Sequence, residues 1–243
     1  MYSNVYDIEE HLREGGAASQ PRWSEYKLDG GSNYREIVFT MPNSSYSNRA
    51  MRAHWGQDAE GVLVHTRVQD LTTKDGDRML FIEELQSDWH NEGAEKGYTT
   101  EEYEDTVATY NTLAEEYAKM RRAFNQYVRS GDFRTDPDDV SKKKFDWLRR
   151  KMDTAEKRMQ DAEKDIESLK KKGMGDTPDA PFRKNYHEYV LKRLLRMAAE
   201  EGYDILGWTP AQVQVERWSE EFAEGYRIEY DQDMPSFLKK YGK

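Results

Sequence analysis

Residues 101–172 most constrain what this chain can fold into, because this charged segment carries apolar residues at alternating intervals of four and three. Such spacing places apolar side chains along one stripe of an α-helix, where they can pair with a second helix. The apolar positions form two runs: Leu113, Tyr117, Met120, Phe124 and Tyr127, and then Leu148, Met152, Ala155, Met159, Ala162, Ile166 and Leu169. We expect two helices that pair along one seam.

Turn-forming residues separate the two runs, at Ser130–Asp132 and again at Asp136–Asp138. Glycine and proline at such positions interrupt a helix and allow the chain to reverse. The sequence therefore predicts an antiparallel αα-hairpin. A solvated structural arm is the simpler interpretation of this hairpin, and a surface that recognises a partner is the alternative.

The signals of a β-sheet lie on the N-terminal side of the hairpin. Residues 34–40 are rich in β-branched and aromatic side chains, which favour strands. Residues 62–68 and 79–85 have the same character, and between them Asp75-Gly76 supplies the positive φ of a tight turn. We expect one strand followed by an antiparallel β-hairpin.

The C-terminal side adds an α/β step to that sheet. A helix with one apolar face is predicted from about Arg183 to Glu201, and Gly202 ends it. A short buried strand over residues 203–208 follows at once. We therefore expect an α+β fold with a mixed, largely antiparallel sheet, packed helices and the inserted long antiparallel αα-hairpin.

Beyond this strand the sequence predicts a short helix and a last strand. Thr209 suits the N-cap position and Pro210 the first turn of a helix that runs to Trp218. Residues 226–230 alternate aromatic or branched residues with charged ones and are predicted to form the last strand.

These elements define the expected domains. Residues 1–29 form an N-terminal arm, residues 30–100 and 176–243 the α+β core, and residues 101–175 the inserted helical hairpin. The arm is expected to be flexible because residues 15–21 are mostly glycine, alanine, serine and proline. Glycines within residues 91–98 predict a loop between the core and the hairpin.

Composition excludes several classes of function. A net charge of -10 argues against general nucleic-acid binding, which needs clustered cations. The absence of cysteine rules out disulfides and thiolate chemistry. No apolar run approaches the roughly 20 residues that span a bilayer, and the N-terminus lacks a signal-peptide core. We expect a cytoplasmic protein with no membrane partner.

The segment Glu83–His90, at the end of a predicted strand, contains several side chains that can take part in catalysis. Strand alternation places Glu84, Gln86 and Asp88 on one face. Carboxylates there can act as general bases, or bind a hard cation such as magnesium. Ordinary solvated or ion-paired carboxylates are the simpler interpretation.

The histidines show no spacing typical of metal ligands. His54 stands beside Trp55 and His187 beside Glu188, and packing is the favoured interpretation of both histidines. We therefore expect no metal site. The motifs of serine hydrolases, P-loop proteins and dinucleotide-binding folds are also absent.

Two further segments are candidate ligand-binding positions. The start of the predicted helix at Arg183 offers backbone amides and two cations, a combination that binds phosphate. The turn after the strand at 203–208 collects polar groups where a strand meets a helix. The candidate residues are Arg183, Lys184, Asn185 and His187 in the first segment and Trp208, Thr209, Gln212 and Arg217 in the second.

Several blocks of sequence resemble a domain that recurs in large polyvalent proteins of tailed phages and related mobile elements. These blocks are residues 33–36, 54–55, 80–90, 178–182 and 202–209, and the resemblance covers most of residues 26–243 outside the hairpin. It implies a phage-encoded protein that acts in the infected cell, including against host defence.

The predicted order of elements also resembles the GNAT acyltransferase fold. In such enzymes a strand-end carboxylate often serves as the base, and a loop leading into a helix N-terminus binds the pyrophosphate of coenzyme A. The resemblance implies acyl-coenzyme A as cofactor, Glu84 as the base supported by Gln86 and Asp88, and residues 182–185 as the phosphate end. In this chain the glycines of residues 93–97 are separated from that helix by the whole hairpin.

Two functions therefore remain open. One is an acyltransferase with a GNAT-like core. The other is a non-catalytic protein that blocks a host protein through residues 101–175, or that sequesters a nucleotide-like ligand.

Overall fold

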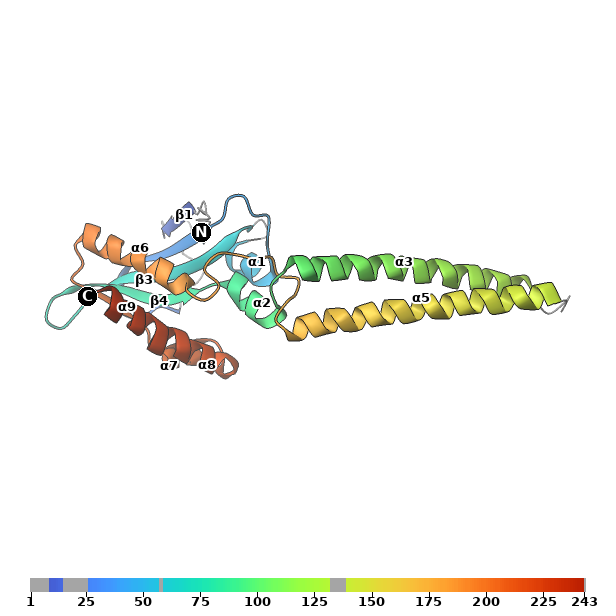
Figure 1. The fold of residues 1–243 in the computed structure, drawn as a ribbon. Coiled ribbons are helices and arrows are strands. Elements are labelled where there is room, and N and C mark those ends of the chain that lie inside the picture. The colour runs from blue at the N-terminus through green and yellow to red at the C-terminus, as the bar shows by residue number, and fades with distance from the viewer. Residues whose placement is uncertain (1–8, 15–25, 57–58, 132–138, 243) are drawn as a thin grey trace. The chain divides into compact units, whose positions relative to one another are not determined.

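The computed structural model describes residues 9–14, 26–56, 59–131 and 139–242 (Figure 1). The chain divides into two compact units. The first contains the described residues up to Asn91 and from Ala180 onwards, and the second contains Glu92–Asp179.

The first unit is built on a five-stranded sheet whose strands follow the order of the chain. The strands are β1 (Glu9–Glu14), β2 (Ser32–Thr40), β3 (Val62–Thr72), β4 (Arg78–Gln86) and β5 (Ile205–Trp208). The pairs β1–β2, β2–β3 and β3–β4 are antiparallel, and β5 is parallel to β4. The predicted mixed, largely antiparallel sheet of an α+β fold is therefore confirmed.

The parallel pairing joins segments from opposite ends of the chain in one sheet. Met79 pairs with Ile205 and Ile82 with Trp208, although the whole second unit lies between these strands in the sequence. The predicted hairpin of β3 and β4 is also present, and Gly76 has the positive φ of 93° that its turn requires.

One face of the sheet is covered by the amphipathic helix α6 (Tyr186–Glu201), as Figure 1 shows. Its buried side chains include Val190, Leu191 and Leu194, which belong to the same hydrophobic core as the strands. Burying this apolar stripe is what stabilises the helix on the sheet. Gly202 ends α6 in the left-handed conformation, with φ of 71°, as predicted.

The predicted last strand at residues 226–230 is wrong. These residues belong to α8 (Ala223–Tyr226) and the π-helix η3 (Arg227–Asp233), which continues into α9 (Met234–Tyr241). Tyr230, Met234 and Phe237 are buried, at helical intervals of four and three, whereas Ile228 is exposed. Five alternating residues fit both periods, and burial of the helical stripe decides between them.

The predicted helix after residue 208 is α7 (Ala211–Arg217), followed by the 3-10 turn η2 (Glu220–Phe222). Its predicted cap is wrong, because Pro210 and not Thr209 occupies the N-cap position. The hydroxyl of Thr209 instead donates to the carbonyl oxygen of Glu83 at 3.0 Å. A tertiary hydrogen bond thus replaces the local capping bond.

The predicted loop at residues 91–98 is also wrong, since α2 (Asp88–Lys96) occupies most of it. The Ser87 hydroxyl accepts from the amide of His90 and supports the start of the helix. Gly93 lies so close to the ring of Tyr98 that a side chain would not fit. The glycine at position 93 is therefore explained by close packing of a helix against Tyr98, and not by a flexible loop.

The predicted N-terminal arm lies mostly outside the described residues, including residues 15–21. Within it, Glu9–Glu14 form the edge strand β1, which the sequence did not predict. The backbone amide of Leu28 donates to Glu83 at 2.8 Å, and the ring of Tyr26 lies 5.1 Å from that of Trp218. Within the first unit, Tyr26 is therefore held by a ring contact and Leu28 by a backbone hydrogen bond, although the side chain of Leu28 is exposed.

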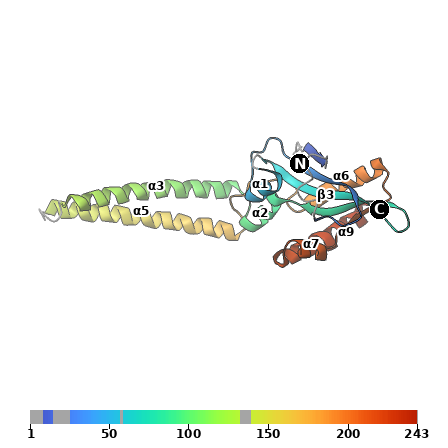
Figure 2. The same ribbon diagram turned by 180° about the vertical axis from the view of Figure 1, so that it is seen from behind.

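The second unit is dominated by two long helices, α3 (Glu101–Ser130) and α5 (Asp139–Lys171), which run side by side in Figures 1 and 2. Tyr103 near the start of α3 bonds to Asp176, beyond the end of α5, and Tyr127 near the end of α3 bonds to Ser141 near the start of α5. The pair is therefore antiparallel, as predicted. Most of the predicted turn, residues 132 and 136–138, lies outside the described residues.

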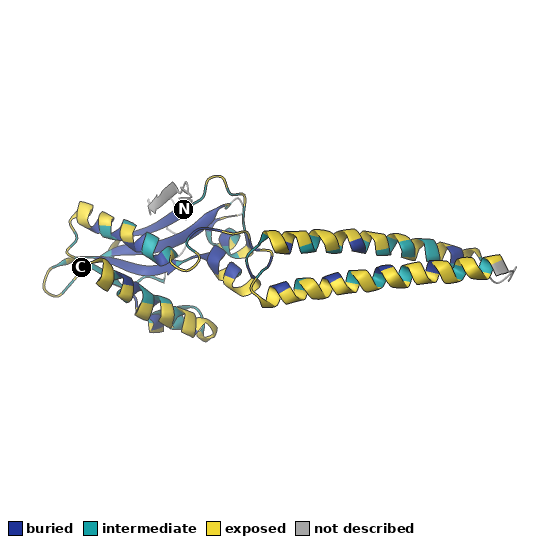
Figure 3. Cartoon of the chain, viewed as in Figure 1, coloured by how far each residue is buried: buried dark blue, intermediate teal, exposed yellow. Residues whose placement is uncertain are grey.

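Burial within the hairpin is confined to one seam, as Figure 3 shows. Leu113, Leu148, Ala155 and Leu169 are buried at the predicted apolar positions, whereas most other residues of the two helices are exposed. None of the helices in the described part of the chain has the length and apolar composition that crossing a bilayer requires.

Candidate active site

The face of the sheet opposite α6 carries buried charged residues. Phe39 contacts Tyr189 of α6, and its cross-strand partner Val64 therefore shares the α6 face. The alternate residues of β3, His65 and Arg67, point to the opposite face. Arg67 is 1% exposed and His65 3%, so this face is closed to bulk water at both residues.

A β-bulge at Glu83 brings Glu84 to the same face. Arg67 pairs with Glu84, but Val68 pairs with Ile82, so Glu83 is an extra residue in β4. The bulge shifts the alternation by one residue, which turns Leu85 toward the apolar core and places Glu84 and Gln86 beside Arg67 and His65.

The bulge is held by side chains of the C-terminal segment. The carbonyl oxygen of Glu83 accepts from Thr209 at 3.0 Å, Gln214 at 2.7 Å and Arg217 at 3.0 Å. Arg217 also bonds the carboxylate of Glu83 at 2.7 Å, and both side chains are largely buried. The carbonyl oxygen at the bulge is thereby satisfied.

Glu84 forms a buried ionic network with Arg67 and His65. Arg67 Nη2 and His65 Nε2 lie 2.5 Å and 3.5 Å from the same oxygen of Glu84. Burial opposes ionisation of this carboxyl, but the hydrogen bond from His65 and the charge of Arg67 outweigh it and lower the pKa of Glu84. Arg67 in turn lies 5.4 Å from the ring centroid of Trp218.

The helix α1 (Arg49–Trp55) supplies a second histidine to the same region. Asn48 caps the helix by accepting from the amide of Met51, and its side-chain nitrogen donates to the backbone oxygen of Asp88 at 3.2 Å. This anchor holds α1 so that His54 Nδ1 lies 2.8 Å from Asp88 Oδ2. The other oxygen of Asp88 accepts from Gln86 at 2.7 Å.

The ion pair of His54 and Asp88 shifts both groups toward their charged forms. Burial disfavours the charge on each, but their hydrogen bond raises the pKa of His54 and lowers that of Asp88. The rings of His54 and His65 also meet edge to face, with centroids 5.6 Å apart. The two acid–histidine pairs therefore lie side by side.

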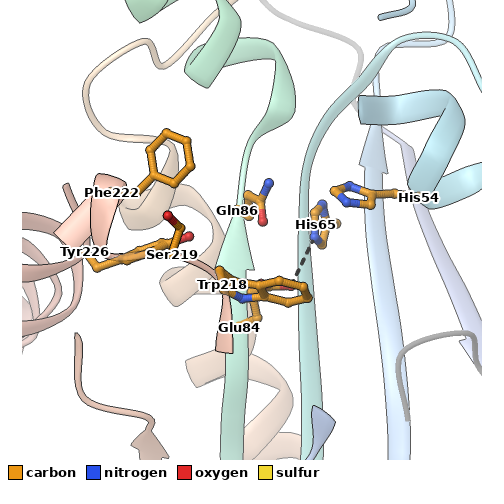
Figure 4. Close-up of a pocket in the computed structure, with 8 residues that line it drawn as sticks. All are labelled: His54, His65, Glu84, Gln86, Trp218, Ser219, Phe222 and Tyr226. Carbon is orange, nitrogen blue, oxygen red and sulfur yellow. Dashed lines mark ion pairs between the residues drawn. The ribbon is translucent and has the colours of Figure 1, made fainter. Parts of the chain in front are cut away.

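These groups open into a pocket of about 270 Å³, drawn in Figure 4. Its polar wall contains His54, His65, Glu84 and Gln86, and the facing wall comes from the C-terminal segment. That facing wall consists of Trp218, Ser219, Phe222 and Tyr226. A pocket with a few converging polar groups and aromatic walls is the usual form of a small-molecule site.

One group of metal-ligand residues is present in this region among the described residues. The ligand-capable atoms of His54, His65 and Asp88 all lie within 4.8 Å of one another. The sequence showed no such site, because the three residues come from α1, β3 and α2 and have no common spacing.

The structure brings the predicted catalytic residues together. Glu84 and Gln86 line the pocket, and Asp88 lies behind them in contact with Gln86 and His54. Their chemical roles stay predictions.

The predicted ligand residues of the Trp208 turn have structural contacts. Thr209 and Arg217 hold the bulge, and Trp208 donates its indole N–H to the backbone of Tyr230 at 3.0 Å. Gln212 is exposed and bonds Glu216. Arg217 thus meets Glu83, the neighbour of the predicted catalytic residue Glu84.

The predicted phosphate-binding residues lie around the start of α6. Arg183 and Asn185 are exposed, and Asn185 is the N-cap residue but makes no side-chain capping bond. Lys184 and His187 line a second pocket of about 580 Å³, together with Glu188, Lys192, Asp233, Ser236, Phe237, Lys240 and Tyr241. The catalytic and phosphate candidates therefore line two different pockets.

His65, Arg67 and Trp218 were missed from the sequence as site residues. The signal was present in β3, where Val64, Thr66 and Val68 alternate with His65, Arg67 and Gln69. In such a strand one face carries the polar side chains. If the strand is buried on both faces, these polar side chains are buried as well.

Comparison of the chain with protein-family models, with curated proteins and with solved structures finds no match in any of the three. Function must therefore be argued from the site itself.

Proposed function

We propose that the pocket beside Glu84 is the active site of an enzyme that transfers an acyl group from acyl-coenzyme A. The proposal rests on one observation, the buried network of Arg67, Glu84 and His65 at the floor of an open pocket. Burying charges costs folding stability. Such arrangements therefore concentrate at functional sites, where they set the charge state of reacting groups.

The topology of the first unit supports acyl transfer as the reaction. Antiparallel strands β2, β3 and β4 are followed by a helix, α6, and a parallel strand, β5. This is the order on which the resemblance to GNAT acyltransferases was based, up to the last strand, which is helical here. A carboxylate at the end of β4 lines the pocket, as that resemblance requires.

The contacts of Glu84 favour a different role from the general base first predicted. A carboxylate with a lowered pKa is a weak proton acceptor. Its bond to His65 Nε2 instead orients that ring. We assign activation of the attacking nucleophile to His65 and His54, and contacts with the substrate to Gln86, Ser219 and Tyr226.

The second pocket is the proposed anchor for the phosphates of coenzyme A. It brings Lys184 together with Lys192 and Lys240 beside the N-terminal end of α6. Lysine side chains and the amides of a helix start both stabilise phosphate charge. Arg183, Asn185 and His187 belong to the same predicted anchor.

Release of coenzyme A from acetyl-coenzyme A, with water or an added primary amine as the acyl acceptor, tests this proposal. The protein contains no cysteine, so a thiol reagent reports only the released cofactor. Two adjacent carboxylates provide matched variants: Glu84→Gln alters the pocket, and Glu83→Gln alters a carboxylate that is equally buried and paired with arginine but does not line it. We expect Glu84→Gln to lower the rate at least about 100-fold more than Glu83→Gln.

Binding of the cofactor gives a second measurement. Acyl-coenzyme A at about 100 times its Kd should stabilise the fold by about 2.7 kcal/mol. No thermal shift with acetyl-, succinyl- or longer acyl-coenzyme A, together with no thiol release, contradicts the proposal. Equal loss of activity in Glu83→Gln and Glu84→Gln shows that stability, and not the pocket, controls the rate.

A second candidate function is protein binding through the hairpin. Two large apolar residues of α5 lie in solvent, Val140 at 69% and Trp147 at 51% exposure. Tryptophan is enriched at the energetic centres of interfaces. Together with the phage resemblance, this supports a host protein as partner, including one that acts in defence, in the cytoplasm of an infected cell.

Capture of proteins from a host lysate tests the second candidate. Trp147→Ser removes the apolar surface, and Arg150→Ser changes an exposed residue of the same helix. We expect loss of specific partners with Trp147→Ser alone. Identical capture by both variants and the unchanged protein excludes this surface.

A further inference from the structure

We propose that His54, His65 and Asp88 form a binding site for one divalent transition-metal ion. Their ligand-capable atoms lie within 4.8 Å of one another, on three elements that meet at the end of β4. Two imidazoles and one carboxylate are a common ligand set for zinc and for non-haem iron.

The spacing is close to what one ion requires. Ligand atoms 2.0–2.1 Å from the same ion are about 2.9 Å apart when adjacent and about 4.1 Å apart when opposite in an octahedron. His54 Nδ1 and Asp88 Oδ2 are already 2.8 Å apart. An ion would replace that hydrogen bond, and the ligand atoms would have to close from separations of up to 4.8 Å.

His65 is arranged as a metal-binding histidine is arranged. Its Nε2 atom faces Glu84 at 3.5 Å, and its buried Nδ1 atom has no hydrogen-bond partner in the part of the chain that the structure describes. Ligating histidines characteristically bond a carboxylate through one nitrogen and the metal through the other. A buried nitrogen without a partner otherwise costs free energy.

The surrounding contacts fix the ligands before any ion binds. Glu84 is held by Arg67, and Asp88 Oδ1 accepts from Gln86 at 2.7 Å. The side chain of Asn48 ties the start of α1, and hence His54, to the backbone of Asp88. Such outer hydrogen bonds set the orientation and affinity of metal ligands.

The site also has room beside it. His54 and His65 line the pocket of about 270 Å³, so an ion bound by three protein atoms would keep a coordination position open to water or substrate. With an ion bound, the two histidines would act on the nucleophile through the ion and not as proton acceptors. That role in acyl transfer rests on the proposed function, whereas binding of the ion does not.

Calorimetric titration of chelator-treated protein with zinc chloride tests the site. We expect one equivalent of zinc to bind, and His54→Gln or His65→Gln to weaken binding by at least about 100-fold, since even outer partners contribute 10- to 100-fold. His187→Gln changes a buried histidine of the other pocket and should leave binding unchanged. His54 is only half-buried, so its variant remains informative if His65→Gln fails to fold.

The adjacent carboxylates separate orientation of His65 from general stability. Glu84→Gln should weaken zinc binding by about 10- to 100-fold, and Glu83→Gln should not. The inference is overturned if the unchanged protein binds no equivalent of zinc, or if His54→Gln and His187→Gln bind it equally well. Zinc binding without thiol release contradicts only the acyltransferase, and thiol release by protein that binds no zinc contradicts only the metal site.

Discussion

The hydroxyl of Tyr230 lies 2.8 Å from the amide nitrogen of Leu85 and 2.9 Å from its carbonyl oxygen. It therefore takes the place of a neighbouring strand, because β5 pairs with β4 only as far as Ile82. The π-helix η3 carries this tyrosine to the uncovered edge of β4. A helical side chain thus completes a sheet whose last strand is short.

Replacing Tyr230 by phenylalanine should therefore destabilise the first unit. Both backbone groups of Leu85 lose a buried partner, and the free energy of unfolding should fall by about 2 to 4 kcal/mol. Urea denaturation measures the change. Tyr241→Phe alters an exposed tyrosine of α9 and should stay within about 0.5 kcal/mol of the unchanged protein. Equal effects would contradict the role of Tyr230.

Arg217→Met should unfold the bulge region more readily, because Glu83 would keep a buried carboxylate without its charged partner. Breaking one side of a buried ion pair costs about 3 to 5 kcal/mol. Gln212→Ala, on the same short helix but exposed, should change stability by less than about 0.5 kcal/mol. Thermal unfolding distinguishes the two, and a small effect for Arg217→Met would show that the pair adds little.

Glu229 should make stability fall as the pH rises from about 4.5 to about 8. Burial raises the pKa of this carboxyl to about 8, and Oε1 has no hydrogen-bond partner among the described residues. Between the ordinary pKa and the raised one, the folded state binds a proton that the unfolded state lacks. The stabilisation is therefore complete at low pH and is lost up to about pH 8, by about 1.4 kcal/mol per pH unit.

The matched variant for this prediction is Glu229→Gln, which keeps the shape and removes the titration. Its free energy of unfolding should lack this downward slope between pH 5 and about pH 8, where the carboxyl of the unchanged protein titrates. Denaturant titrations across that range measure the difference. Parallel pH profiles for the two proteins would show that Glu229 is ionised in the folded state.

Two glycines in helices should respond in opposite directions to alanine. A methyl group at Gly93 would collide with the ring of Tyr98, whereas one at Gly225 would meet open space. We expect Gly93→Ala to destabilise the second unit by about 1 to 3 kcal/mol, the usual range for overpacking. Gly225→Ala should stabilise by about 0.5 to 1 kcal/mol through helix propensity. Circular dichroism during thermal unfolding reports both.

Long, regular patterns in the sequence predicted the fold well. The four-and-three spacing from Leu113 to Leu169 fixed the paired helices, and Asp75-Gly76 fixed the hairpin of β3 and β4. Short or ambiguous signals failed. Residues 226–230 fit two periods, and the glycines of residues 91–98 serve tight packing within and after α2 rather than a loop.

The site was predictable only in part, because each of its two carboxylate–histidine pairs joins residues that are far apart in the sequence. Glu84 and Gln86 were found from their place at a strand end. Their partners His65 and Arg67 belong to another strand, and His54 to a short helix whose position depends on Asn48. Only the alternation of β3 carried any local sign of these residues.

The extra residue in β4 ties the two walls of the pocket together and is not itself required for the acidic floor. A variant that lacks Glu83 would have regular alternation from Ile82 onward, and Glu84 would still lie opposite Arg67. Arg217 would lose its carboxylate partner, and the C-terminal wall of the pocket would lose one of its attachments to the sheet. A single-codon deletion at this position is therefore expected to keep the charged floor and to loosen the aromatic wall.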